Sequence, residues 1–473
     1  MIQTSIFDIL YPKFKIDKPI RLIEMFAGYG SQALALKYLG VQFEHWKICE
    51  WAVKSIQAYK DIHFGNDITD YSANLSKEWL VEYLSNKGIS ADYNKPMTID
   101  QIKRLNENQL RTIYNNIKAT HNLVNIQQVK ANDLEITDTD NFIYICTYSF
   151  PCQDLSLAGN RKLMSDNSTR SGMLWEVERI LDECNGNLPQ ILLMENVPQV
   201  HGEGATEDFK KWQLKLESLG YKNYWQDLIA TDYGIPQTRN RCFMISILGG
   251  YSYSFPPKQE LKLKLKDMLE DNVDEKYYLS DKQIEDIKSW NAYEKPLENM
   301  EKTDKNNISP TLTTRSGAYA AGMILVKNAT TKGYLEARDG DGVDISARME
   351  YHRGTVQKGK TQTLTTMGGE NNGVVVNPLK GISGKSWQFE QQVYDENGSA
   401  RTLKASEGSG NIPKVVNDLR IRKLTPKECF RLMGVRDEDY EKVAKNQSNA
   451  SLYHLAGDSI VVNVLIAIFK ELL

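Results

Sequence analysis

One short stretch of this 473-residue chain constrains its fold more than any other. Residues 142–147 (Phe-Ile-Tyr-Ile-Cys-Thr) are apolar or β-branched and carry no charge, which predicts a buried strand of an α/β sheet. Pro151 ends strand pairing and places Cys152 at the carboxyl end of this strand, where open α/β sheets build their sites. A polar loop follows, with a predicted helix from about Gly172. The pattern fits either a nucleophilic thiol beneath a closing loop or a small buried cysteine.

A second feature is a glycine-containing turn near the amino terminus. Residues 21–26 predict a strand and 31–39 a helix, with Ala-Gly-Tyr-Gly at 27–30 between them. In this geometry, backbone N–H groups at a helix start can bind a ligand, although a plain tight turn uses glycines in the same way. The next predicted strand, 43–48, leads to Glu50 and Trp51. A carboxylate can accept bonds from ribose hydroxyls and an indole can stack on a purine, so the two segments predict an adenosyl-containing cofactor.

Titratable groups also follow two later extended segments. The apolar run 191–194 predicts a strand that ends at Glu195, which either caps a turn or serves as a site acid. Further on, Gln237, Arg239 and Arg241 lead into the predicted strand 242–248. Alternate residues of an extended segment share a face, and two buried guanidinium groups need anionic partners. By itself, such a pair of arginines is more often solvated.

Taken in order, these segments resemble a known family. The glycine turn at 26–30, Glu50-Trp51, Pro151-Cys152-Gln153, Glu195-Asn196-Val197, the 237–241 segment and a capped helix start at 425–434 are similar to the motifs of cytosine-C5 DNA methyltransferases. The resemblance implies a Rossmann-like S-adenosylmethionine methyltransferase sheet with helices on both faces, plus a smaller, mainly β target-recognition domain. It leaves two alternatives open, namely a tRNA cytosine-C5 methyltransferase and a non-catalytic DNA-binding descendant.

The resemblance also implies roles for individual residues. The implied catalytic residues are Cys152, Glu195, Arg239 and Arg241. The implied cofactor-binding residues are Phe26, Gly28, Gly30, Glu50, Trp51, Asp133, Asp458 and Ser459. The candidate DNA-binding residues are Gln153, Ser156, Arg161, Lys162, Arg170, Gln237, Thr313, Arg315, Thr365 and Lys358. The family usually has Asn where this chain has Asp458, and Asp67 competes with Asp133 for the adenine contact.

The implied reaction explains why these residue types are needed. Cytosine C5 is a poor nucleophile, so the Cys152 thiolate first adds to C6 of a flipped-out base. An acid at Glu195 protonates N3, and burial would raise its pKa so that a proton is available. C5 then takes the methyl group and loses its proton, and the thiol is eliminated. The substrate implied is a specific short sequence of double-stranded DNA.

The implied domains are a catalytic domain, 1–257 with 421–473, and a target-recognition domain, 258–420. Residues 71–125 form a probable insertion, with helical stretches predicted at 77–85 and 99–114 and a strand-like segment at 124–129 just beyond. Thr-Leu units recur at 311, 363 and 402 with aliphatic runs after each, which predicts repeated β-hairpins. A closing amphipathic helix is expected to open at Gly457.

The composition limits the partners, the metal sites and the cellular location that we expect. With a net charge of −3, a polyanion must be met by local basic patches. The six cysteines show no C-x-x-C spacing, which argues against a zinc site or a disulfide framework, so no metal is expected. No signal peptide is evident, and the apolar run 461–469 is too short to span a bilayer. We expect a cytoplasmic, nucleoid-associated monomer, with a cognate restriction endonuclease as a candidate partner.

Overall fold

The computed structural model describes residues 12–150, 170–202, 205–277 and 424–473, together with short strands between 323 and 423. The chain forms two compact units. The first comprises Met1–Leu263, Lys404–Glu407 and Pro426–Leu473, and the second comprises Lys264–Leu403 and Gly408–Thr425. The functional division into catalytic and target-recognition domains stays a prediction.

A six-stranded sheet organises the first unit, in the order β2-β1-β3-β4-β6-β5. Its strands are β1 (Ile20–Met25), β2 (Phe43–Cys49), β3 (Ile143–Tyr148), β4 (Ile191–Asn196), β5 (Tyr221–Ile229) and β6 (Asn240–Leu248). β1 to β4 are parallel, whereas β6 is antiparallel to both of its neighbours. Five strands of this sheet, β1 to β4 and β6, were predicted from the sequence and are confirmed. β5 was not predicted, because its half-exposed residues lack a continuous apolar run.

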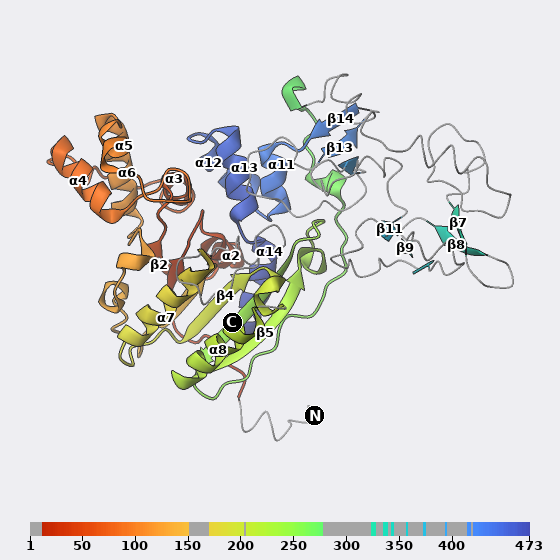
Figure 1. Cartoon of the computed structure of the whole chain (residues 1–473), viewed down its shortest axis with the longest axis horizontal. Helices are drawn as coiled ribbons and strands as arrows, with labels where there is room; N and C mark the ends of the chain where they lie inside the picture. Colours follow the sequence, from red (N-terminus) through yellow and green to blue (C-terminus); the bar gives the residue numbers. More distant parts are fainter. Residues whose placement is uncertain are drawn as a thin grey trace. The chain divides into compact units, whose positions relative to one another are not determined.

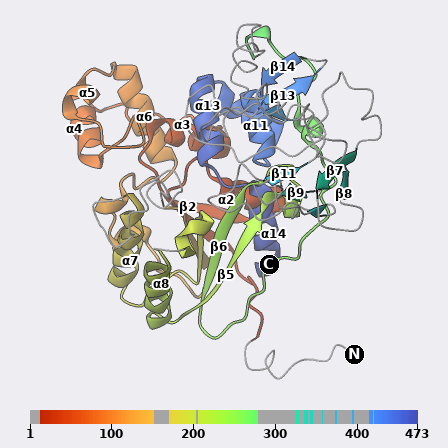
Figure 2. The same ribbon diagram turned by 45° about the vertical axis from the view of Figure 1, so that its right-hand side comes forward.

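Helices cover both faces of this sheet (Figures 1 and 2). α7 (Leu174–Glu183) and α8 (Thr206–Ser218) share one face. Their apolar sides join one core cluster with alternate strand residues, among them Tyr144, Tyr148, Leu192, Met194, Cys242 and Met244. α2 (Ser31–Leu39) and α14 (Val462–Leu472) pack together on the other face. The expected helix at 31–39 is confirmed, and α7 begins two residues after the position predicted for it.

The insertion forms a separate helical group beside α3 (Val53–His63), at the left of Figure 1. It contains α4 (Lys77–Lys87), α5 (Ile99–Lys103) and α6 (Glu107–Ala119). The helical stretch expected at 99–114 is confirmed in part, since it is divided between α5 and α6. Asn106 interrupts it, because its side chain caps α6 by accepting the N–H of Gln109.

The strand expected at 124–129 is also wrong. Asn125 accepts the N–H of Gln127 and turns the chain into a short 3-10 helix, Ile126–Gln128. The segment that lies against the outer edge of β2 is instead Asn122, in an isolated parallel bridge with Ile48.

The carboxyl-terminal helices are α11 (Pro426–Leu432), α12 (Asp437–Ala444), α13 (Asn449–Asp458) and α14. The expected start at Pro426 is confirmed. The closing helix is confirmed, but it begins later than Gly457: Gly457 and Asp458 end α13, and extended backbone at Ser459 precedes α14. Taken together, Asn449–Leu472 is long and apolar enough to cross a membrane by composition alone, but 72% of its most apolar window is buried within the fold.

The second unit contains the expected aliphatic strands. β7 (Met323–Lys327) pairs antiparallel with β8 (Tyr334–Arg338). β9 (Gly342–Asp344) lies between β10 (Val356–Gln357) and β11 (Asn372–Val374). β13 (Lys414–Asn417) lies between β12 (Val393–Tyr394) and β14 (Arg420–Lys423). The Thr-Leu units lie outside the described residues.

Candidate active site

The glycine turn after β1 and the end of β2 are joined by one carboxylate. Glu50 accepts the backbone N–H of Gly28 at 2.9 Å through one oxygen and that of Ala52 at 2.8 Å through the other. The carbonyl of Cys49 also accepts the N–H groups of Phe26 and Ala27. Burial raises the pKa of Glu50 to about 7, although the backbone donors oppose the rise. Each carboxylate oxygen retains a lone pair for a further donor.

Backbone conformation explains the two glycines. Gly28 has φ +55°, and a Cβ added there would meet nothing within 4 Å, so the turn borders open space at this point. Gly30 has φ +83°, and its Cβ would lie 2.4 Å from Nε2 of His63 and 2.6 Å from the ring of Tyr59. Only glycine fits the second position. Phe26 also has a positive φ, 60°, which is uncommon outside glycine.

A buried acid–base pair occupies the same end of the sheet, at β4 and β6. Nε of Arg241 lies 3.1 Å from Oε1 of Glu195, and both side chains are largely buried. Burial raises the pKa of Glu195, as the sequence predicted, while Arg241 and Arg239 oppose the rise. The pair therefore holds a carboxyl group, whose pKa burial raises, beside a fixed positive charge.

The other two residues of the 237–241 segment bind the carboxyl-terminal segment. Arg239 donates to the carbonyls of Gly457 at 3.1 Å and Ser459 at 2.7 Å. Gln237, predicted to contact DNA, is fully buried and donates to the carbonyl of Leu432 at 2.7 Å. The expected DNA contact is corrected, because this amide holds the fold together. Arg239, whose charge also acts on Glu195, donates in addition to two backbone carbonyls.

Asp458 lies at the end of α13, half-exposed, 3.0 Å from Nε2 of His454. Its negative charge contributes to the raised pKa of both Glu195 and Glu50. The carboxyl-terminal segment is therefore within electrostatic range of both the glycine turn and the acid–base pair. Ser459, 8% exposed, is fixed by its carbonyl bond to Arg239.

The nucleophile candidate lies just beyond the described residues. Phe150 is described, and its carbonyl accepts Nδ2 of Asn196 at 3.0 Å, which ties the chain after β3 to the end of β4. Several predicted residues lie outside the described part of the chain: Cys152, Gln153, Ser156, Arg161, Lys162, Thr313, Arg315, Lys358 and Thr365. Arg170 starts a 3-10 helix before α7, and only its backbone is described.

The two candidates for the adenine contact lie in different places. Asp133 is exposed in the 3-10 helix Ala131–Leu134, where its carboxylate accepts the N–H of Lys130 at 2.8 Å. Asp67 follows α3, which runs away from Glu50, and lines a cavity of about 940 Å³ at the opposite end of β2. Its position at the opposite end of β2 argues against Asp67 as the adenine contact. The adenine contact of Asp133 remains a prediction.

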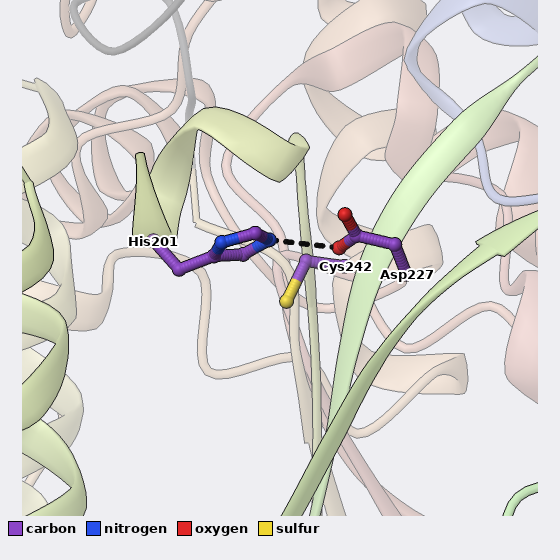
Figure 3. Close-up of side chains that lie close together, drawn as sticks. All are labelled: His201, Asp227 and Cys242. Carbon is purple, nitrogen blue, oxygen red and sulfur yellow. Dashed lines mark hydrogen bonds and ion pairs between the residues drawn. The ribbon is translucent and has the colours of Figure 1, made fainter. Parts of the chain in front are cut away.

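One cluster near β4 was not predicted. His201, in the 3-10 helix Pro198–His201, bonds Asp227 of β5 at 2.9 Å, and Cys242 of β6 lies beside them (Figure 3). Their ligand atoms lie within 4.8 Å of one another, and imidazole, carboxylate and thiolate are the donors that zinc prefers. The scattered positions of these residues leave no spacing motif. The described hydrogen bond between His201 and Asp227 satisfies this pair without an ion.

The fold and site define a class of protein: a Rossmann-like α/β protein whose glycine turn and buried Glu195–Arg241 pair lie at the carboxyl edge of its parallel strands. Comparisons identify the family. The family model for C-5 cytosine-specific DNA methylases matches residues 96–473. The type II methyltransferase M2.ScrFI of Lactococcus lactis subsp. cremoris is 33% identical over 457 residues, covering 96% of this chain and 99% of the relative. The orphan methyltransferase M.SssI of Spiroplasma monobiae is 39% identical over 266 residues, 56% of this chain and 68% of that protein.

The chain therefore belongs to the C-5 cytosine-specific DNA methylases and is a DNA cytosine-5-methyltransferase. A solved structure has the same fold. The S. pombe Dnmt2 methyltransferase aligns with a TM-score of 0.50 at 14% identity, covering 96% of this chain and 98% of that one. The predicted family and the Rossmann-like fold are confirmed.

Proposed function

We propose that the enzyme transfers a methyl group from S-adenosylmethionine to C5 of a flipped-out cytosine within a specific short sequence of duplex DNA. The observation that carries this proposal is the buried Glu195–Arg241 pair, which joins β4 to β6 at the edge where the chain after β3 leads toward Cys152. Glu50 and the glycine turn, whose Gly28 N–H it accepts, together form what we call the Glu50–Gly28 cradle. This cradle lies at the same edge, because β1 and β3 are parallel neighbours.

The cradle fits the methyl donor. The carboxylate of Glu50 would accept the ribose hydroxyls, and the open space beside Gly28 leaves room for the methionine portion. Trp51, partly exposed at the end of β2, would stack on the adenine. When bound, this cofactor supplies an electrophilic methyl group.

The chain's own residues would make the cytosine ring reactive. The thiolate of Cys152 adds to C6, forming the carbon–sulfur bond that converts the ring into an enamine-like nucleophile. Glu195 donates a proton to N3, which its raised pKa favours. Arg241 holds Glu195 in place and presents a positive charge to the cytosine O2. After C5 takes the methyl group, a base removes the C5 proton, the thiolate is expelled, and N3 returns its proton to Glu195, which restores the neutral ring and the starting acid.

We also infer how DNA contacts the enzyme, where the enzyme works and which partner it has. The target base must leave the duplex to reach this edge, and the 154–171 loop, with Arg161, Lys162 and Arg170, would close over it and contact phosphates. Five cysteines among the described residues are buried and unpaired, which fits a monomer in the reducing cytoplasm. A cognate restriction endonuclease is the partner that a type II methyltransferase implies.

Expression in a host without cytosine methylation, followed by bisulfite sequencing of its DNA, tests the proposal. We expect protected cytosines in one short shared sequence. Fully converted DNA, from folded protein that binds S-adenosylmethionine, would contradict the proposed substrate.

A matched pair of thiol variants tests the nucleophile. Cys152→Ser should lose methylation and keep cofactor binding. Cys184→Ser changes a buried thiol at the end of α7, away from the acid–base pair, and should keep both. A Cys152→Ser variant that methylates DNA as fast as the Cys184→Ser variant would refute the role of Cys152.

A further inference from the structure

The segment Glu50–Val53, which carries the proposed ribose and adenine contacts, is held on its outer side by the helical insertion. We propose that Asn122 and Ser90 of the insertion are positioning residues for the methyl donor, fixing this backbone so that Glu50 and Trp51 are preorganised. This inference rests on the proposed function of the same site. It gives the insertion, which lacks family-wide motifs, a role in cofactor affinity.

Asn122 clamps Glu50 through both ends of its amide. Nδ2 donates to the carbonyl of Glu50 at 2.9 Å, and Oδ1 accepts the N–H of Glu50 at 3.1 Å. The same oxygen accepts the N–H of Val124 at 2.9 Å. Asn122 is only 6% exposed, so these bonds compete little with water. The side chain thus takes the place that a neighbouring strand would occupy beside β2.

Ser90 acts through its backbone. Its N–H donates to the carbonyl of Trp51 at 2.8 Å, and its carbonyl accepts the N–H of Val53 at 2.9 Å. Its hydroxyl points elsewhere and donates to the carbonyl of Lys95 at 2.8 Å. Asn122 and Ser90 together bind four backbone groups between Glu50 and Val53.

The backbone beside Asn122 is strained. His121 has φ 50° and Val124 has φ 74°, and a positive φ at a β-branched residue is a conformational outlier. Such strain persists only where the surrounding structure enforces it, and it concentrates at functional sites. Here it accompanies the return of the chain to the end of β2, where Leu123 donates to the carbonyl of Ile48.

Packing makes the insertion a firm support. Trp51 and Val53 pack against a cluster formed mainly by the insertion itself, which includes Leu80, Leu84, Ile89, Ile113 and Ile117. The face of Trp51 that meets this cluster is therefore fixed, and the polar clamp sets the position of its backbone.

The test compares Asn122→Ala with Asn116→Ala in the full-length chain. Asn116 is also 6% exposed and lies in α6, but its amide bonds Gln57 of α3 and makes no bond to the 50–53 segment. We measure the Kd for S-adenosylhomocysteine by calorimetry, kcat, the KM values for S-adenosylmethionine and DNA, and the Tm.

We expect Asn122→Ala to raise the Kd and the cofactor KM by about tenfold, with kcat and the KM for DNA nearly unchanged. Both variants should lower the Tm by a similar amount, but Asn116→Ala should leave the cofactor KM unchanged. Equal cofactor affinity in both variants, or a loss confined to kcat, would overturn the inference. If Asn122→Ala does not fold, Asn122→Ser, which keeps a hydroxyl at this position and adds no charge, is judged by the same criteria. Failure of the wild-type enzyme to bind cofactor would instead refute the proposed function.

Discussion

The raised pKa of Glu50 predicts that cofactor binding depends on pH. Burial raises this pKa from the ordinary 4.5 to about 7. Only the ionised carboxylate accepts bonds from both ribose hydroxyls, so the binding-competent fraction is roughly one tenth at pH 6 and nine tenths at pH 8. The apparent Kd is the intrinsic Kd divided by this fraction. It should therefore fall about tenfold from pH 6 to pH 8, equivalent to about 1.4 kcal/mol.

Calorimetric titration with S-adenosylhomocysteine measures this dependence without turnover. The Glu50→Gln variant should bind more weakly at pH 8 and lose the tenfold change, because its side chain does not titrate. The ligand's own amino group titrates nearby, and the Gln variant carries that same contribution as a background. A wild-type Kd that is equal at pH 6 and pH 8, or a Gln variant that keeps the full dependence, would refute the reasoning.

Four further predictions concern other groups of the sheet and its edge. Gly30→Ala should destabilise the fold by roughly 2 kcal/mol or more in urea titrations and abolish cofactor binding, because the new Cβ meets His63 and φ is positive. Glu195→Gln should lower kcat by about 10²- to 10⁴-fold with unchanged affinity for S-adenosylhomocysteine. Arg241→Ala should move the pH–rate profile to higher pH, because it removes a charge that lowers the Glu195 pKa. Burial raises the pKa of Glu24 from 4.5 to about 7, so its contribution to stability, present in full below about pH 4.5, is lost as pH rises through 7. Glu24→Gln should remove a decline of about 3 kcal/mol from the pH dependence of unfolding.

The candidate site was predictable in its parts. The glycine turn, Glu50 and Glu195 each lie at the carboxyl end of a predicted parallel strand, and parallel strands bring these ends to one edge. Arg241 lies at the start of β6, which reaches the same edge because it runs antiparallel to β4. The errors fell where a local side chain redirected the backbone, as Asn125 does after Val124.

The sequence by itself determined the family and five strands of the sheet, because the motifs keep a fixed order along the chain and the central strands β3 and β4 are mostly apolar. Only the tertiary structure decided how the polar groups pair. Arg239 and Arg241 are two residues apart and chemically identical, yet one binds the carbonyls of Gly457 and Ser459 and the other binds Glu195. The clamp of Asn122 on Glu50 joins residues 72 positions apart. Such partners depend on long-range packing, which no local pattern encodes.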